Sequence, residues 1–253
     1  MCNMKNKKYT FGDITFEIES PILHEDKNTC EAFLSDRETD CLIRVCLCEE
    51  DAAPDCKTER HGNVITRHLT EKQASGMSVS SLLASSEAAF VFPEYDAFIL
   101  HAAYIIYEGQ AILFTAPSGT GKSTQAEFWK TERGAEIVNG DRVLITKRNG
   151  RFYANGIYAS GTSGISRNAT APIRAVVLLE QGADNEQLPV PPRMLFLRTL
   201  CECSYDVKNK EQCEKITELV SDMINALPVV CYSCRNNPDA VDSLERTMLW
   251  KKE

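Results

Sequence analysis

The stretch FTAPSGTGKST, residues 114–124, constrains the fold more than any other part of the chain. An apolar strand ends here, a turn of small residues follows, and Lys122 and Ser123 open a segment predicted to be helical to about Glu132. Backbone N–H groups in such a turn can face inward around a phosphate, and a helix N-terminus adds partial positive charge at the same place. The sequence therefore predicts a strand, a phosphate-binding loop (P-loop) and a helix in immediate succession.

The loop predicts a site for a nucleotide and Mg²⁺. Lys122 would neutralise the β and γ phosphates, and the Ser123 hydroxyl would ligate Mg²⁺. Alanine stands at position 116, where the usual pattern has glycine, and we expect the loop to tolerate it if its φ is negative. The alternative is a glycine-rich turn with an incidental Lys-Ser pair. The residues predicted to bind the nucleotide are Ser118, Gly119, Thr120, Gly121, Lys122, Ser123 and Thr124.

Phosphoryl transfer needs a second metal contact and a group that takes the proton of the acceptor. Asp141, in EIVNGDRV, ends an apolar strand that we expect beside the strand of the loop. The alternative interpretation is that Asp141 belongs to a hairpin turn and makes only local hydrogen bonds, since Asn-Gly-Asp is common in turns. Glu180 ends the apolar run AVVLLE, but the following Gln181-Gly182 favours an exit into a surface turn.

A segment rich in Gly, Ser and Thr, YASGTSGISRNAT, is the expected binding loop on the acceptor side. In and just before this segment, Gly156, Gly161 and Gly164 allow close approach, and Thr162 and Ser163 offer hydroxyl groups. Arg167 would stabilise the transferring phosphoryl group through its guanidinium fork. The alternative is a flexible surface loop of linker-like composition.

Charge and composition exclude several classes of partner. The formal net charge is −8 over 253 residues, and no long Lys/Arg cluster provides a surface for nucleic acid or an anionic membrane. No apolar run reaches the roughly 18 residues of a membrane-spanning helix, and the start of the chain lacks the apolar core of a signal peptide, so we expect a cytoplasmic protein. Its eleven cysteines are then expected to be reduced. Cys231 and Cys234 alone have the spacing of a zinc half-site, and free thiols are favoured over metal.

The pattern of apolar residues divides the chain into two regions. Residues 1–95 predict an N-terminal antiparallel β layer, with an ambiguous helix or loop near residues 71–89. Residues 96–253 predict a domain that carries the P-loop, with hairpin turns at Glu108-Gly109 and at Asn149-Gly150. A helical stripe near the C-terminus is predicted to be core: Ile216, Leu219, Val220, Met223, Ile224 and Leu227.

The order of His101, Lys122 and Asp141-Arg142-Val143 resembles the catalytic domain of the HPr serine kinase/phosphorylase family over about residues 96–180. The resemblance implies an α+β or α/β fold, a mixed β-sheet core carrying the P-loop as in phosphoenolpyruvate carboxykinases. It also implies that Ser123 and Asp141 hold the metal, that Asp141 is the general base, and that His101 lies beside it. On the residues alone, the alternative for His101 is a hydrogen-bonded core residue on an apolar strand. Relatives assemble into rings, which implies a possible homo-oligomer.

Two departures from this family bear on function. Gly140 stands where the family has the first aspartate of a pair, and the later signature that serves HPr recognition has no match in the C-terminal third. The leading hypothesis is an ATP- and Mg²⁺-dependent kinase that acts on a serine-type hydroxyl of a protein, a peptide or a small molecule. The alternative is a nucleotide-binding regulatory module without phosphoryl transfer, and a carboxykinase-like enzyme is a weaker third reading.

Overall fold

The computed structural model describes residues 4–23, 30–49 and 57–249. The chain divides into two compact units, Met1–Phe92 and Pro93–Glu253. Within the described residues, no helix is long and apolar enough to cross a membrane.

The first unit is built on a five-stranded sheet with the order β1-β2-β3-β5-β4. The hairpins β1–β2 and β4–β5 are antiparallel, but β3 pairs in parallel with both β2 and β5. The predicted antiparallel layer was therefore wrong for the middle of the sheet. The chain between β2 and β3 is long enough to return to the starting end of the sheet, which a parallel pair requires. The strands are β1 (Lys5–Phe11), β2 (Ile14–Ser20), β3 (Cys41–Cys48), β4 (Thr58–His61) and β5 (Val64–Thr70).

The ambiguous segment after β5 forms two short helices, α1 (Glu71–Gly76) and α2 (Val79–Ser85). Each begins at a hydroxyl N-cap: the side chains of Thr70 and Ser78 accept hydrogen bonds from the backbone N–H groups of Gln73 and Ser81. Short 3₁₀ turns occur at η1 (Glu31–Phe33), η2 (Ala88–Phe90) and η3 (Phe92–Tyr95).

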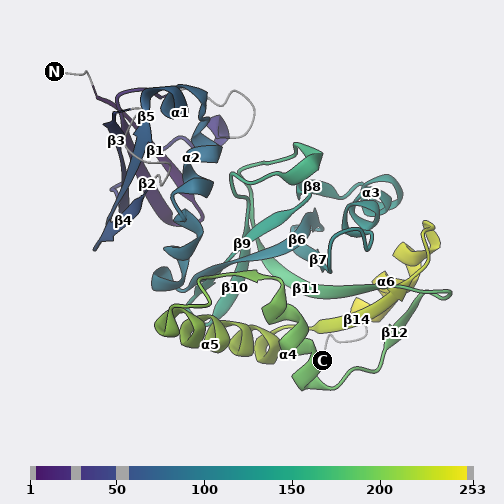
Figure 1. Cartoon of the computed structure of the whole chain (residues 1–253). Coiled ribbons are helices and arrows are strands. Elements are labelled where there is room, and N and C mark those ends of the chain that lie inside the picture. The colour runs from purple at the N-terminus through teal and green to yellow at the C-terminus, as the bar shows by residue number, and fades with distance from the viewer. Residues whose placement is uncertain (1–3, 24–29, 50–56, 250–253) are drawn as a thin grey trace. The chain divides into compact units, whose positions relative to one another are not determined.

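The second unit contains a nine-stranded mixed sheet whose main path is β10-β9-β6-β7-β11-β14-β12 (Figure 1). Strands β7, β11 and β14 run parallel to one another, and β10 also pairs with β11, which closes part of the sheet on itself. The predicted mixed sheet is confirmed. The strands are β6 (Ala97–Tyr107), β7 (Gln110–Thr115), β8 (Glu136–Asn139), β9 (Arg142–Arg148), β10 (Arg151–Asn155), β11 (Thr170–Gln181), β12 (Glu186–Leu188), β13 (Cys203–Ser204) and β14 (Val229–Cys234).

Both predicted hairpin turns are present. Glu108 and Gly109 join β6 to β7 with φ values of 51° and 73°, and Asn149 and Gly150 join β9 to β10 with 49° and 75°. Two consecutive positive φ values match the right-handed twist of the flanking strands.

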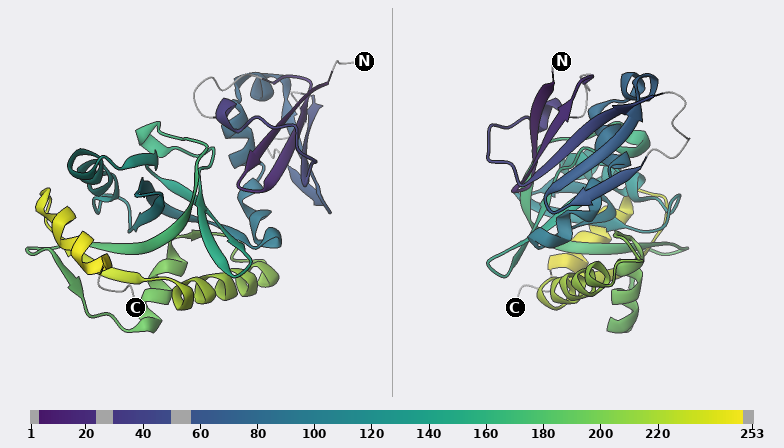
Figure 2. Two further views of the ribbon diagram at one scale, coloured as in Figure 1. Left: turned by 180° about the vertical axis from the view of Figure 1, so that it is seen from behind. Right: turned by 60° about the vertical axis from the view of Figure 1, so that its left-hand side comes forward.

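Helices cover both faces of this sheet. On one face lie α3 (Lys122–Arg133) and α6 (Asp239–Leu249), and on the other lie α4 (Pro192–Cys201) and α5 (Lys210–Ala226) (Figures 1 and 2). Successive residues of β11 belong to the two cores in alternation: Val177 packs on the α3 side and Val176 on the α5 side. A strand buried on both faces is continuously apolar, as the sequence of β11 shows.

The predicted stripe on α5 is confirmed, with Ile216, Leu219, Val220 and Met223 buried in the core and Ile224 and Leu227 packed against it. On β14, Cys231 belongs to the core on the α5 side and Cys234 to the core on the α3 side. Thiols three residues apart on a strand point to opposite faces, so these two cannot bind one metal ion.

Candidate functional site

Residues 116–121 form a loop, here called the 116–121 loop, between the end of β7 and the start of α3. Gly119 and Gly121 have φ values of 82° and 113°, and a Cβ on either would meet no atom of the described part of the chain within 4 Å. The protein itself therefore needs glycine here for the backbone conformation rather than for space. Ala116 is buried and is not among the described residues with positive φ, so the condition for alanine at this position is met.

Lys122 lies folded over the 116–121 loop. Its ammonium group donates hydrogen bonds to the carbonyl oxygens of Ala116 at 2.7 Å and Pro117 at 3.4 Å, and the residue is 7% exposed. Burial lowers the pKa of Lys122, while the charges of Glu202 and Asp141 act in the opposite direction. The cation is thus held at the loop and faced by two carboxylates.

The start of α3 leaves backbone N–H groups without helical partners. The first helical hydrogen bond runs from Gln125 N–H to Gly121 O at 2.9 Å. Gly121 is the N-cap residue and has no side chain that could cap the amides between it and Gln125. These amides and the helix dipole provide partial positive charge beside Lys122. Thr120 differs from the other predicted ligands, because its amide and its hydroxyl both donate to Pro117 O.

His101 on β6 lies between two carboxylates. Its Nδ1 is 2.8 Å from Glu202 Oε2, and its Nε2 is 3.5 Å from Asp141 Oδ1. The backbone of His101 is fixed as well: its N–H donates to Glu202 O at 2.9 Å, and its carbonyl accepts from Thr115 Oγ1 at 2.9 Å. The ring is therefore held at a defined position between β7 and the chain that follows α4.

Asn139 positions Asp141 through a buried side chain. Its Oδ1 accepts the backbone N–H groups of Asp141 at 2.9 Å and Arg142 at 3.0 Å, and its Nδ2 donates to Ala159 O at 2.7 Å. Asn139 ends β8, which pairs with β6 and not with β7. The expectation that the strand leading to Asp141 lies beside the loop strand was wrong, since β6 lies between them.

A cavity of about 270 Å³, here called the charged cavity, brings most of the predicted residues together. It is lined from the loop and α3 by Ser118, Gly119, Gly121, Lys122, Ser123 and Thr124, and from other elements by His101, Gly140, Asp141 and Ser163.

Two residues predicted to act at the site, Thr120 and Arg167, do not line the charged cavity. Arg167 is exposed and its guanidinium donates to Glu136 at 2.7 Å, so the structure does not bring it to the charged cavity. Glu180 pairs with Arg198 at 2.5 Å on the side of the sheet that α4 covers.

The loop that contains the 3₁₀ turn η4 (Gly161–Ser163) packs tightly on the turn at Gly140 and Asp141. A Cβ on Gly140 would lie 2.6 Å from Ser163 Oγ, and a Cβ on Gly161 would lie 2.6 Å from the Cβ of Asp141. Ser163 therefore fills the space into which a side chain at position 140 would project.

Two residues of the site were not predicted as functional. Glu202 follows α4 in the sequence CEC and approaches His101 because β13 pairs with β6, and no local pattern indicates that pairing. Asn139 was interpreted as part of an Asn-Gly turn, which is the usual meaning of that dipeptide. Its full burial is a property of the fold and not of the dipeptide.

The residues present fit a nucleotide and a magnesium ion. The uncapped amides and Lys122 suit a polyphosphate, and Ser123 and Asp141 place a hydroxyl and a carboxylate in one cavity. No group of three or more His, Cys, Asp or Glu side chains in the described part of the chain is arranged to hold a metal ion. Mg²⁺ is commonly bound by one or two protein oxygens together with substrate phosphates, which this donor set can supply.

No protein-family model matches the chain, and no curated protein matches it. Among solved structures, the chain is similar to the HPr(Ser) kinase/phosphatase from Coxiella burnetii at 15% sequence identity and a TM-score of 0.36. The match covers 60% of this chain and 91% of that one.

Proposed function

We propose that this protein is an ATP- and Mg²⁺-dependent kinase that transfers the γ-phosphate to a serine-type hydroxyl. The observation that carries the proposal is the charged cavity, in which the ammonium of Lys122 and the Asp141–His101 pair line one space. A phosphate held on the 116–121 loop would lie in the same cavity as the carboxylate that can take a proton from the acceptor. Proximity of these groups is what phosphoryl transfer requires.

In this mechanism the chain binds, orients and takes up one proton. The amides at the start of α3 and Lys122 bind the phosphates, and their positive charge stabilises the negative charge of the transferring group. Asp141 accepts the proton of the attacking hydroxyl. Ser123 and Asp141 would hold Mg²⁺, which when bound neutralises phosphate charge.

Glu202 and His101 contribute by holding an imidazole N atom beside the Asp141 carboxylate. Glu202 is largely buried and binds Nδ1 of His101, which directs Nε2 towards the Asp141 carboxylate. Glu202 is thus a positioning residue, since it contacts the imidazole and does not itself line the charged cavity.

The second candidate is a nucleotide-binding module that transfers nothing. The observation that favours it is the occupation of the space beside Gly140 by Ser163, which leaves no room for the carboxylate expected from the resemblance.

The test combines ATP binding with turnover. The full chain is incubated with Mg·ATP and a panel of serine-containing proteins, peptides and small alcohols, and ADP formation is measured for the wild type and Asp141→Asn. Asp222→Asn is the matched control, because Asp222 lies on α5, pairs with Lys147 of β9 and does not line the charged cavity. Acceptor-dependent ADP formation that Asp141→Asn abolishes and Asp222→Asn retains supports the kinase. ATP binding without turnover on any acceptor supports the second candidate.

A further inference from the structure

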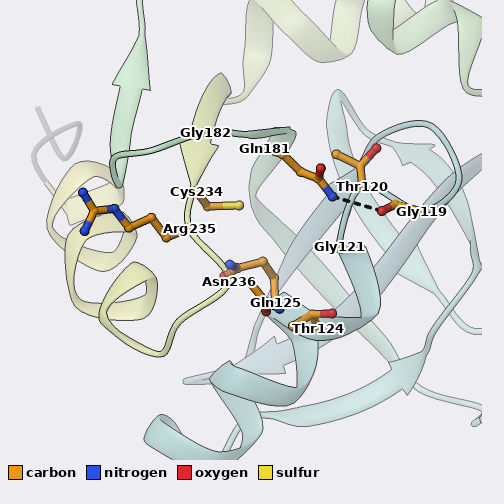
Figure 3. A pocket seen from close by; sticks show the side chains of 10 residues that line it. All are labelled: Gly119, Thr120, Gly121, Thr124, Gln125, Gln181, Gly182, Cys234, Arg235 and Asn236. Atoms are coloured by element: carbon orange, nitrogen blue, oxygen red, sulfur yellow. Dashed lines mark hydrogen bonds between the residues drawn. The ribbon is translucent and has the colours of Figure 1, made fainter.

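A second cavity of about 390 Å³ lies at the C-terminal ends of the parallel strands β7, β11 and β14 (Figure 3). The 116–121 loop and the start of α3 form one wall, and residues 181–182 and 234–236 form the other. We call it the amide pocket. Its volume is within the roughly 300–1,000 Å³ of small-molecule sites. Ligands of open α/β sheets bind in the crevice at the carboxyl ends of the strands, which is where this pocket lies.

The amide pocket and the charged cavity lie on either side of the same loop. Gly119, Gly121 and Thr124 line both, and β7 lies between β6, which carries His101, and β11, which ends at the amide pocket. A ligand that extends over the loop amides from the charged cavity therefore enters the amide pocket.

The two cavities differ in chemistry. The charged cavity contains Lys122, His101 and Asp141. Among the described residues that line the amide pocket there is no carboxylate, and the polar side chains are mainly amides and hydroxyls. Arg235 is the one cation among these described lining residues. Its guanidinium donates to Asp184 at 2.8 Å and runs away from the pocket in Figure 3. Uncharged hydrogen-bond donors and acceptors therefore lie beside a site that suits phosphates. This arrangement matches a molecule with a heterocycle and hydroxyl groups at one end and phosphates at the other.

Gln125 provides an unpartnered acceptor at the wall of the amide pocket. The residue is 2% exposed, and its Oε1 has no hydrogen-bond partner among the described residues. The neighbouring thiol of Cys234, which also lines the pocket, donates to Glu180 O at 3.6 Å and so does not supply a hydrogen bond to this oxygen. A buried carbonyl oxygen without a donor is costly, and a ligand N–H or hydroxyl would satisfy it.

The opposite wall is fixed before any ligand binds. Gly182 N–H donates to Cys234 O at 3.2 Å, and a Cβ on Gly182 would lie 1.9 Å from Ser233 Oγ, so the backbone approaches there as only glycine allows. Gln181 Nε2 donates to Gly119 O at 3.2 Å and links this wall to the loop (Figure 3). Preformed walls reduce the ordering cost of binding.

We propose that the amide pocket binds the base and ribose of the nucleotide whose phosphates lie on the 116–121 loop. The inference rests on the proposed nucleotide site and adds to it a second binding region, with Gln125 and Asn236 as residues that contact the nucleoside. Asn236 is exposed at the pocket, and no partner for its side chain occurs within the described residues.

The test separates the nucleoside from the phosphates. Calorimetry measures the Kd of Mg·ATP and of Mg·tripolyphosphate for the full-length wild type, Gln125→Met and Asn236→Ala. Gln187→Ala is the control, because Gln187 is exposed on β12 and lines neither cavity. We expect the wild type to bind ATP more tightly than tripolyphosphate. Each pocket variant should weaken ATP about 3- to 10-fold, as loss of one hydrogen bond implies, and change tripolyphosphate less than about twofold.

Other results would contradict either the nucleotide site or the role of the amide pocket. If the wild type binds neither compound, the nucleotide site itself fails. If it binds both equally, or if the preference for ATP survives in both variants, the amide pocket does not hold the nucleoside although the phosphate site stands. Asn236→Ala alters an exposed side chain, so it keeps the test informative if Gln125→Met does not fold.

Discussion

Replacing Gly140 by alanine tests how tightly the loop at η4 closes on the charged cavity. The new Cβ would lie 2.6 Å from Ser163 Oγ and 2.9 Å from Ser163 Cβ, and it would meet no other atom of the described residues within 4 Å. Contacts this short force side chain or backbone to move, and overpacking of this kind costs about 1–3 kcal/mol. We expect Gly140→Ala to lower the free energy of unfolding of the second unit by that amount.

A double-mutant cycle with Ser163→Gly isolates the contact. Ser163→Gly alone loses the hydrogen bonds of Ser163 Oγ with Ser160 O at 2.8 Å and Ile165 N–H at 3.3 Å, which costs about 1 kcal/mol. In that background Gly140→Ala meets free space and should be neutral to within about 0.5 kcal/mol. The coupling energy should therefore be about 1–3 kcal/mol. Urea unfolding followed by the fluorescence of Trp129, which is buried in the second unit, measures each corner of the cycle.

An equal cost of Gly140→Ala in both backgrounds would refute this reasoning, and so would a neutral Gly140→Ala alone. The cycle also predicts the behaviour of Gly140→Asp, the residue that the resemblance expects. It should destabilise the wild type at least as much as alanine does and should be tolerated better with Ser163→Gly.

Four further predictions concern charged groups. Lys122→Met should weaken Mg·ATP binding at least about tenfold in calorimetry, because it removes a charge-assisted contact to phosphate. Asp141→Asn should retain ATP binding and lose acceptor-dependent ADP formation, measured at saturating ATP. Glu202→Ala should lower kcat about 10- to 100-fold with little change in KM for ATP, and Glu202→Gln, which keeps an acceptor for His101, should recover part of the loss. The hydrogen bond from Arg198 lowers the pKa of Glu180 below 4.5, so its stabilisation is present above that pH and is lost as pH falls through the folded pKa. Urea unfolding should therefore show Arg198→Leu to be less stable than the wild type at pH 7, with the difference shrinking towards pH 3.

Local patterns predicted the elements that depend on local chemistry. The two hairpin turns, helix α3 from Lys122 and the stripe on α5 follow from φ preferences and apolar spacing, and each is present. Strand pairing between distant segments was beyond those patterns. The sequence of β3 carries no sign that it pairs in parallel with β2 and β5, because alternation fixes which face is buried and not the direction of the neighbour.

The same limit explains the residues that were missed in the candidate site. The 116–121 loop could be found because one continuous segment carries it. Glu202 reaches His101 through the two-residue strand β13, and Asn139 acts through complete burial, which no dipeptide pattern shows. Arg167 was assigned to the phosphoryl group from composition alone, and Glu136 holds its guanidinium at the surface instead.

The contacts of His101 show whether glycine at position 140 leaves the site without a second carboxylate. A carboxylate at position 140 would adjoin Asp141 directly, and two like charges so close repel each other. Here the second carboxylate, Glu202, lies across the imidazole from Asp141, at 2.8 Å from Nδ1 while Asp141 is 3.5 Å from Nε2. The ring separates the two negative charges and contacts both. Glycine at 140 therefore does not leave Asp141 as the sole acid near His101, and the absence of an aspartate there is no sufficient reason to regard the site as inactive.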